Sequence, residues 1–171
     1  MEENEIGKIV VDAAVKVHSA LGPGLLESVY EAVLAKELEG RSLSVVRQVA
    51  VPIEYAGMKF DEGFRADLIV EGKVILELKS VEQMSKVHHK QLFTYLKLKE
   101  LKLGYLLNFG APLIKDGIKR MVNGLENDNL GVLGSLPCGR LRALSLSKWR
   151  DSKMNGQPGG DLNSDSLRSS P

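Results

Sequence analysis

Residues 64–79 restrict the fold of this chain more than any other stretch, because two short apolar segments flank a turn that contains Gly72. Side chains alternate between the two faces of a strand, so a buried face must carry every second residue. A two-residue turn would set charged residues opposite apolar ones, whereas a three-residue loop over residues 71–73 matches apolar with apolar. The pattern therefore predicts an antiparallel hairpin with Val70 opposite Val74.

The same register places two carboxylates side by side on the other face of the hairpin. Asp67 is then opposite Glu77, with Cβ atoms about 5 Å apart, and Arg65 is opposite Lys79. Two carboxylates at that separation repel each other unless a cation lies between them or one of them takes up a proton. Because one or two carboxylates with waters and phosphate oxygens are the usual magnesium ligands, the pair predicts a divalent-metal site.

A lysine beside such a metal can orient or deprotonate a bound water, which is a role available to Lys79. The two carboxylates, Arg65 and Lys79 could instead form a solvated ion-pair ladder on the outer face of a sheet. These four residues alone do not distinguish the two interpretations.

Length and composition describe one soluble domain. The chain has 171 residues, enough for one well-buried domain but short for two. No apolar run approaches the roughly 20 residues that span a bilayer, and the first residues are acidic where a signal peptide would be basic. We therefore expect a cytoplasmic protein without a membrane partner. Cys138 is the single cysteine, which excludes an internal disulfide and a cysteine-based metal cluster within one chain.

Apolar residues at helical spacing predict three main helices. The first follows Asn4 as N-cap and ends near Leu21, the second covers residues 25–39, and the third follows Ser85 as N-cap and ends near Leu101. On the third helix, Gln91 and Tyr95 are one turn apart and share a face with His88. A glutamine on an inner face is costly unless it is hydrogen-bonded, although a partly exposed glutamine beside a packed tyrosine is an alternative.

Further strands are predicted over residues 45–54 and 103–109, and Pro52 places the first of them at a sheet edge or a bulge. Residues 114–122 are predicted to form a short closing helix. A strand, helix, strand step near the end implies a parallel pair, so the fold class is α/β, a mixed sheet flanked by helices. The domain is predicted to cover residues 1–124. Residues 125–171 are poor in aromatic residues and rich in polar ones, and they are predicted to form a flexible extension.

The chain after the hairpin is locally basic, although the formal net charge of the sequence is only +1. Residues 79–102 contain six lysines and two histidines against two glutamates. A basic surface of this kind is typical of phosphate binding, and Lys86, His88 and Lys90 are the predicted nucleic-acid contacts. A solvated, lysine-rich helix face is the alternative.

Taken together, these features resemble the PD-(D/E)xK nuclease superfamily in order and spacing. The residues that carry the resemblance are Glu27, Asp67, Glu77, Leu78, Lys79, Gln91 and Tyr95. Residues 24–30, Gly-Leu-Leu-Glu-Ser-Val-Tyr, resemble the signature of the GxxExxY family, which is placed in that superfamily. The likeness covers about residues 5–124. Ala66 stands where the superfamily name has proline, which leaves the ligand set intact.

The resemblance implies a restriction-endonuclease-like core and a nuclease that hydrolyses phosphodiester bonds, with DNA as the expected partner and Mg²⁺ or Mn²⁺ as cofactor. Asp67, Glu77 and the backbone carbonyl of Leu78 would hold the metal, and Glu27 would complete the ligand shell directly or through water. Lys79 would position or activate the attacking water.

Gln91 and Tyr95 resemble the Gln-x-x-x-Tyr element of RecB-type nucleases and would orient Lys79 or a phosphate. Two alternatives stay open: a non-catalytic nucleic-acid or protein-interaction module that retains the nuclease core, and a hydrolase of another phosphate ester. The oligomeric state is not predicted.

Overall fold

The computed structural model describes residues 1–125, in which two helices precede three strands, and a crossover helix precedes the rest of the sheet. The elements are α1 (Glu3–Leu21), α2 (Glu27–Glu39), β1 (Val45–Tyr55), β2 (Met58–Val70), β3 (Val74–Lys79), α3 (Lys86–Leu98), β4 (Leu103–Asn108), α4 (Ile114–Gly117) and β5 (Ile118–Val122). Among these residues no helix is both long and apolar enough to cross a membrane.

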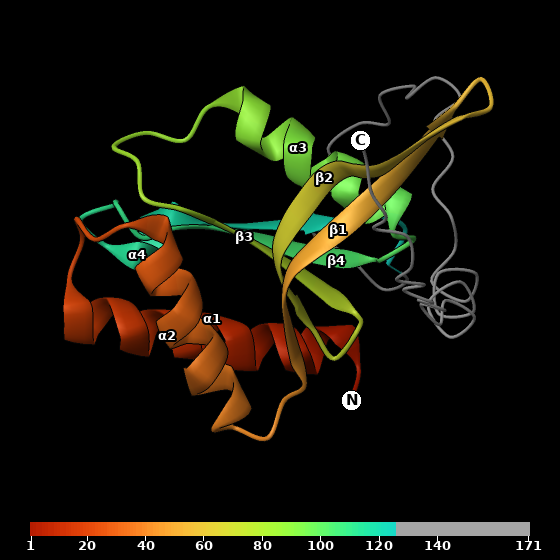
Figure 1. Ribbon diagram of the computed structural model, residues 1–171. Coiled ribbons are helices and arrows are strands. Elements are labelled where there is room, and N and C mark those ends of the chain that lie inside the picture. Colours follow the sequence, from red (N-terminus) through yellow and green to blue (C-terminus); the bar gives the residue numbers. More distant parts are fainter. Residues whose placement is uncertain (126–171) are drawn as a thin grey trace, which may run out of the picture.

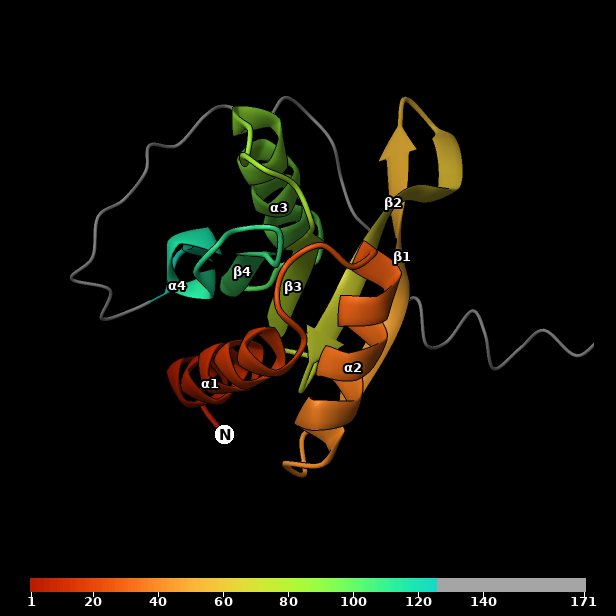
Figure 2. The same ribbon diagram turned by 90° about the vertical axis from the view of Figure 1, so that its left-hand side faces the viewer.

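The described strands form one mixed sheet in the order β1-β2-β3-β4-β5. Neighbouring strands are antiparallel except β3 and β4, which are parallel and are joined by α3. Helices α1 and α2 cover one face and α3 covers the other (Figures 1 and 2). Each face has its own apolar core, one with Leu76 and Leu78 and the other with Ile75 and Leu106. The predicted mixed sheet flanked by helices is confirmed.

The hairpin register is confirmed near its loop. Val70 pairs with Val74 and Leu68 with Leu76, and Glu71 and Gly72 in the loop have positive φ angles of 53° and 63°. The ladder between β2 and β3 ends at Leu68, so the predicted backbone pairing of Asp67 with Glu77 is absent from it.

The predicted alternation also fails next to Asp67. Leu68 packs in the core beneath α1 and α2, but Ala66 packs beneath α3. Strict alternation would have put both on one face. The predicted pairing of Arg65 with Lys79 is likewise absent, since the β2–β3 ladder ends at Leu68. The guanidinium of Arg65 bonds Glu62 instead. The strand therefore changes faces at Asp67.

The closing helix predicted over residues 114–122 is wrong in its second half. Helix α4 is only four residues long, and Ile118–Val122 pairs antiparallel with β4. A Cβ atom on Gly117 would lie 2.4 Å from the carbonyl oxygen of Asn108, so the chain passes β4 closely here. The open edge of β4 offers backbone hydrogen bonds that a longer helix would leave unused.

Helix termini differ slightly from the prediction. Glu2, not Asn4, is the N-cap of α1, and the Glu5 side chain accepts the backbone N–H of Glu2 at 2.9 Å. The side chain of Asn4 instead accepts a hydrogen bond from Arg120. Ser85 is the N-cap of α3, as predicted. Asn4 therefore ties α1 to β5, and Glu2 and Glu5 cap the helix.

Pro52 fulfils both of its predicted alternatives. β1 is an edge strand of the described sheet, and the β1–β2 register shifts between Val51 and Ile53. The hairpin of β1 and β2 extends beyond the other strands (Figure 2). The predicted C-terminal extension, with Cys138, lies outside the described residues except for Leu125.

Candidate active site

The predicted catalytic side chains gather where β3 ends. Glu77 and Lys79 lie on β3, Asp67 on the neighbouring β2, Gln91 and Tyr95 on α3, and Glu27 at the first residue of α2. Hydrogen bonds or charge interactions join each of them to another member of the group or to the backbone of Leu78 or Ser80. Side chains separated by as many as 68 positions in the chain thus meet at one strand end.

Glu77 is the centre of this group. Its side chain is 2% exposed, and its Oε1 accepts hydrogen bonds from Lys79 Nζ and Gln91 Nε2, both at 2.9 Å. Its Oε2 is buried and has no hydrogen-bond partner. Burial raises the pKa of Glu77 to about 7, with a further upward contribution from Asp67 and a downward one from Lys79. A buried carboxylate oxygen without a partner is costly, so this oxygen is suited to a cation or a proton.

Asp67 interacts electrostatically with Glu77, although the two residues are not paired in the β2–β3 ladder. Its Oδ2 accepts the backbone N–H of Leu78 at 2.8 Å, a bond that a backbone carbonyl would otherwise supply. Burial raises the pKa of Asp67, although the Leu78 hydrogen bond and Lys79 oppose that shift. The geometry leaves two partly desolvated carboxylates, with Asp67 close enough to raise the pKa of Glu77.

The side-chain amine of Lys79 is protonated in this geometry, because its pKa is raised. Burial lowers the pKa of its ammonium group, but the hydrogen bond and charge of Glu77 outweigh burial, so the net shift is upward. Its side chain is 14% exposed. A charged lysine can donate hydrogen bonds and stabilise negative charge, but it cannot accept a proton. This favours an orienting and electrostatic role for Lys79 over that of a base.

Gln91 and Tyr95 hold Glu77 from the side of α3. Gln91 Nε2 contacts both Glu77 Oε1 at 2.9 Å and the Tyr95 hydroxyl at 2.6 Å. The Tyr95 ring packs against Phe64, with centroids 5.3 Å apart. The inner glutamine predicted from the sequence is therefore hydrogen-bonded, and it contacts the carboxylate directly.

Glu27 fixes the backbone that follows Lys79. Its Oε1 accepts the N–H of Ser80 at 3.0 Å, and the Ser80 hydroxyl donates to the carbonyl of Leu25 at 2.7 Å. Its negative charge also contributes to the raised pKa values of Asp67 and Glu77. Glu27 thus lies within electrostatic reach of both carboxylates while anchoring the end of β3.

Tyr30 stabilises the loop before α2, which includes the first residues of the 24–30 segment. Its hydroxyl donates to the carbonyl of Gly22 at 2.6 Å and accepts the N–H of Leu25 at 3.2 Å. Its ring stacks on Phe109, with centroids 4.5 Å apart. Gly24 has a φ angle of 105°, which L-residues rarely adopt. The tyrosine and the glycine together shape the loop that presents Glu27 to Ser80.

Two polar residues near the site were missed by the sequence reasoning. Asn108 is 3% exposed, and its side chain bonds the N–H of Val81, the N–H of Gly110 and the carbonyl of Val81. Glu31 is 5% exposed and lies one turn after Glu27. The available signal was a polar residue at the end of an apolar strand for Asn108, and the four-residue spacing from Glu27 for Glu31.

The predicted nucleic-acid contacts lie on the first turns of α3. Lys86 and Lys90 are exposed, and His88 is half-buried and accepts the backbone N–H of Ser85. The helix that carries them also carries Gln91. Further along the chain the basic surface is interrupted, because Lys99 is buried and burial lowers its pKa.

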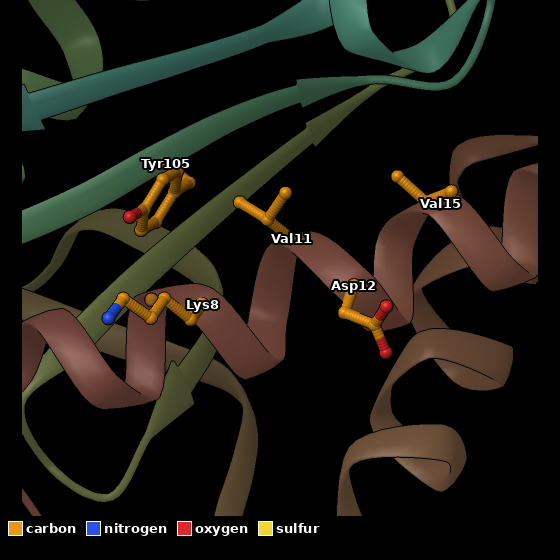
Figure 3. A pocket seen from close by; sticks show the side chains of 6 residues that line it. Lys8, Val11, Asp12, Val15 and Tyr105 are labelled. Atoms are coloured by element: carbon orange, nitrogen blue, oxygen red, sulfur yellow. The ribbon is translucent and has the colours of Figure 1, made fainter.

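A shallow pocket of about 360 Å³ lies elsewhere, between α1 and β4 (Figure 3). It is lined by Gly7, Lys8, Val11, Asp12, Val15 and Tyr105. None of the predicted catalytic residues lines it. The chemistry-bearing group at the end of β3 is therefore separate from this pocket.

The donor set at the end of β3 fits a hard divalent cation. Within residues 1–125, no three or more His, Cys, Asp or Glu side chains converge as a metal cluster. Magnesium needs fewer protein ligands than that, since one or two carboxylates with waters and substrate oxygens suffice. The unpartnered Oε2 of Glu77, the carboxylate of Asp67 and the carbonyl of Leu78 are oxygen donors of the required kind.

Comparison with known proteins identifies the family of this chain. A family model of the PD-(D/E)XK nuclease superfamily matches residues 4–121, which is more than half of the chain and includes every residue of the predicted catalytic set. No curated protein and no solved structure matches the chain. On its family match, mixed sheet and Asp67, Glu77-Leu78-Lys79 arrangement, this chain belongs to the PD-(D/E)XK nuclease superfamily.

Proposed function

We propose that the protein is a nuclease that hydrolyses phosphodiester bonds of nucleic acid, with DNA as the expected substrate and Mg²⁺ or Mn²⁺ as cofactor. The observation that carries the proposal is the buried Oε2 of Glu77, which has no partner although Asp67 and Lys79 surround the same carboxylate. A purely structural carboxylate would be expected to use both oxygens. Family membership supports the reaction class.

Asp67, Glu77 and the carbonyl of Leu78 would hold the cation, with Glu27 completing the shell directly or through water. When bound, the cation would offset charge on the scissile phosphate and make the attacking water more acidic. Glu27 already accepts the N–H of Ser80, so its second oxygen is the one suited to a water-mediated contact.

The remaining work falls to groups of the chain itself. The ammonium of Lys79 would orient the attacking water and stabilise negative charge on the phosphate, because it is held at the site by Glu77. Gln91 and Tyr95 would keep the Glu77 side chain in one rotamer and so keep its free oxygen aimed at the site. Lys86, His88 and Lys90 would contact backbone phosphates without reading bases.

We also propose that the chain is a GxxExxY protein within the superfamily. Gly24, Glu27 and Tyr30 support this assignment, because each has a distinct task in shaping the loop before α2 and the end of β3.

The deciding experiment is cleavage of plasmid and single-stranded DNA, and of RNA, with Mg²⁺ or Mn²⁺. Asp67→Asn and Lys79→Ala should abolish cleavage while leaving the circular dichroism spectrum unchanged. Asp61→Asn, an exposed position on the same strand as Asp67, and Lys36→Ala, an exposed position on α2, are the matched controls and should cleave normally.

A folded wild-type protein that cleaves none of these substrates would count against a nuclease. Calorimetry then separates the alternatives. Metal binding that depends on Asp67 and Glu77, with turnover of another phosphate ester, would indicate a different phosphate hydrolase. Absence of such binding would indicate the non-catalytic interaction module.

A further inference from the structure

The ladder between β1 and β2 has a gap opposite Asp67. Arg47 pairs with Leu68 and Val49 pairs with Ala66, which leaves Gln48 as the residue across from Asp67. Gln48 has a φ angle of 51°. Non-glycine residues rarely adopt this left-handed conformation, and those that do are held there by their surroundings.

The side chain of Gln48 is hydrogen-bonded to Glu31. Neighbouring residues of a regular strand point to opposite faces, but Arg47 and Gln48 both reach the carboxylate of Glu31. Arg47 Nε donates to Oε1 at 2.8 Å and Gln48 Nε2 donates to Oε2 at 2.6 Å. An ion pair with Arg47 alone would need neither Gln48 nor its unusual backbone.

The consequences appear at Asp67. The face change between Ala66 and Leu68 occurs at this residue, and Asp67 Oδ2 accepts a hydrogen bond from the N–H of Leu78. The charge of Glu31 also contributes to the raised pKa of Asp67, so the two carboxylates are within electrostatic reach. The β1–β2 ladder and the β2–β3 ladder are therefore both interrupted at Asp67.

We propose that Glu31 is a positioning residue for Asp67: by bonding Gln48 and Arg47 it holds the left-handed residue opposite Asp67 and thereby fixes the direction of the Asp67 carboxylate. The effect on activity rests on the proposed nuclease function. The positioning itself is a property of the folded chain, and it is measurable without metal or substrate.

The measurement is native-state amide exchange at Leu78, whose N–H is held by Asp67. In full-length Glu31→Gln, the Leu78 amide should exchange at least about tenfold faster than in wild type, relative to the amides of β4, because the partly buried hydrogen bond to Asp67 is weakened. Glu37→Gln is the matched control, since Glu37 lies on the same helix and also accepts hydrogen bonds from two side chains, Lys16 and Arg41.

A rescue variant separates positioning from general stability. Gln48→Gly loses the bond to Glu31 but adopts a positive φ without steric cost. In Glu31→Gln/Gln48→Gly, the Leu78 amide should regain at least half of its lost protection. A merely structural role predicts no rescue, because the glycine removes a further contact. Leu78 exchange that changes only in step with β4, or that the glycine does not restore, would overturn the proposal.

Kinetics provide the second readout. Glu31→Gln should lower kcat by about tenfold or more with KM nearly unchanged, and Gln48→Gly should restore part of it. If wild type cleaves nothing while Leu78 responds as described, the nuclease proposal fails and the positioning stands. If wild type cleaves nucleic acid but Leu78 does not respond to Glu31→Gln, the positioning fails and the nuclease stands.

Discussion

Glu77→Gln should change how the stability of the metal-free protein depends on pH. The substitution keeps the shape of the side chain and removes its charge. In wild type, burial first and Asp67 second raise the pKa of Glu77 from 4.5 to about 7. Glu77 in the unfolded chain ionises near the ordinary value, so folding takes up a proton between pH 4.5 and pH 7.

The sign follows from this proton uptake. The folded state binds the proton more tightly, so wild-type stability falls as pH rises from 4.5 to 7 and then levels off. At about 1.4 kcal/mol per pH unit, the raised pKa corresponds to roughly 3 kcal/mol across the window. Glu77 is 2% exposed, so solvent screening reduces this figure little.

The assay is urea denaturation from pH 4.5 to 8 in chelator, followed by circular dichroism. The pKa of about 7 already includes the ion pair of ionised Glu77 with Lys79. Replacing the protonated side chain by glutamine therefore adds only a difference in stability that does not depend on pH. The robust quantity is therefore the pH dependence of the difference. The free energy of unfolding of Glu77→Gln minus that of wild type should rise by about 3 kcal/mol from pH 4.5 to 8.

Glu37→Gln is the control of opposite sign. Hydrogen bonds from Lys16 and Arg41 lower the pKa of Glu37 from its ordinary value of 4.5, so its ionised form stabilises the protein above that pH and loses the effect as pH falls below it. The difference for Glu37→Gln should therefore stay nearly level over most of the assay range and change mainly at and below pH 4.5. The reasoning about Glu77 would be refuted by a difference that stays within about 1 kcal/mol over the whole pH range.

Three further predictions concern the elements around the site. Mn²⁺ should raise the Tm of wild type at pH 8 by several degrees but not that of Glu77→Gln, as measured by calorimetry; an equal rise in both would argue against this ligand. Tyr30→Phe should lower the free energy of unfolding by about 1–3 kcal/mol in urea titrations, because the hydroxyl bonds two backbone groups of the loop before α2. Gly110→Ala should destabilise by more than about 2 kcal/mol in the same titrations, since its Cβ would lie 2.6 Å from the Val81 carbonyl; a neutral effect would show that this loop moves freely.

Apolar pattern predicted the hairpin as far as Leu68 because strand periodicity determines register wherever one face is buried. It failed at Asp67 because the apolar pattern carries no information about polar contacts between distant residues. The left-handed Gln48 is held by Glu31, 17 positions earlier, and neither residue is apolar. Asn108 escaped notice in the same way, since its partner Val81 is 27 positions away.

Residues 114–122 show a different limit. Their apolar residues fit helical spacing, but the same residues also suit a short strand. The open edge of β4 decided between the two, and that edge exists only after β3 and β4 have paired. Glu27, Gln91 and Tyr95 were assigned roles through the resemblance, because the spacing of one sequence alone does not bring them to β3.

The destabilising features of this fold converge on the carboxylates. Glu77 keeps a buried oxygen without a partner, Gln48 occupies a strained backbone region, and Asp67 replaces a backbone acceptor in the sheet. The unpartnered oxygen and the strained residue each lower stability, and a sequence selected for stability alone would lose them through substitutions such as Glu77→Gln. Strain of this kind persists where the surroundings enforce it and a function requires it. Because Glu31 and Gln91 enforce it with partly buried hydrogen bonds from two separate helices, the end of β3 is built to keep two carboxylates together despite their repulsion.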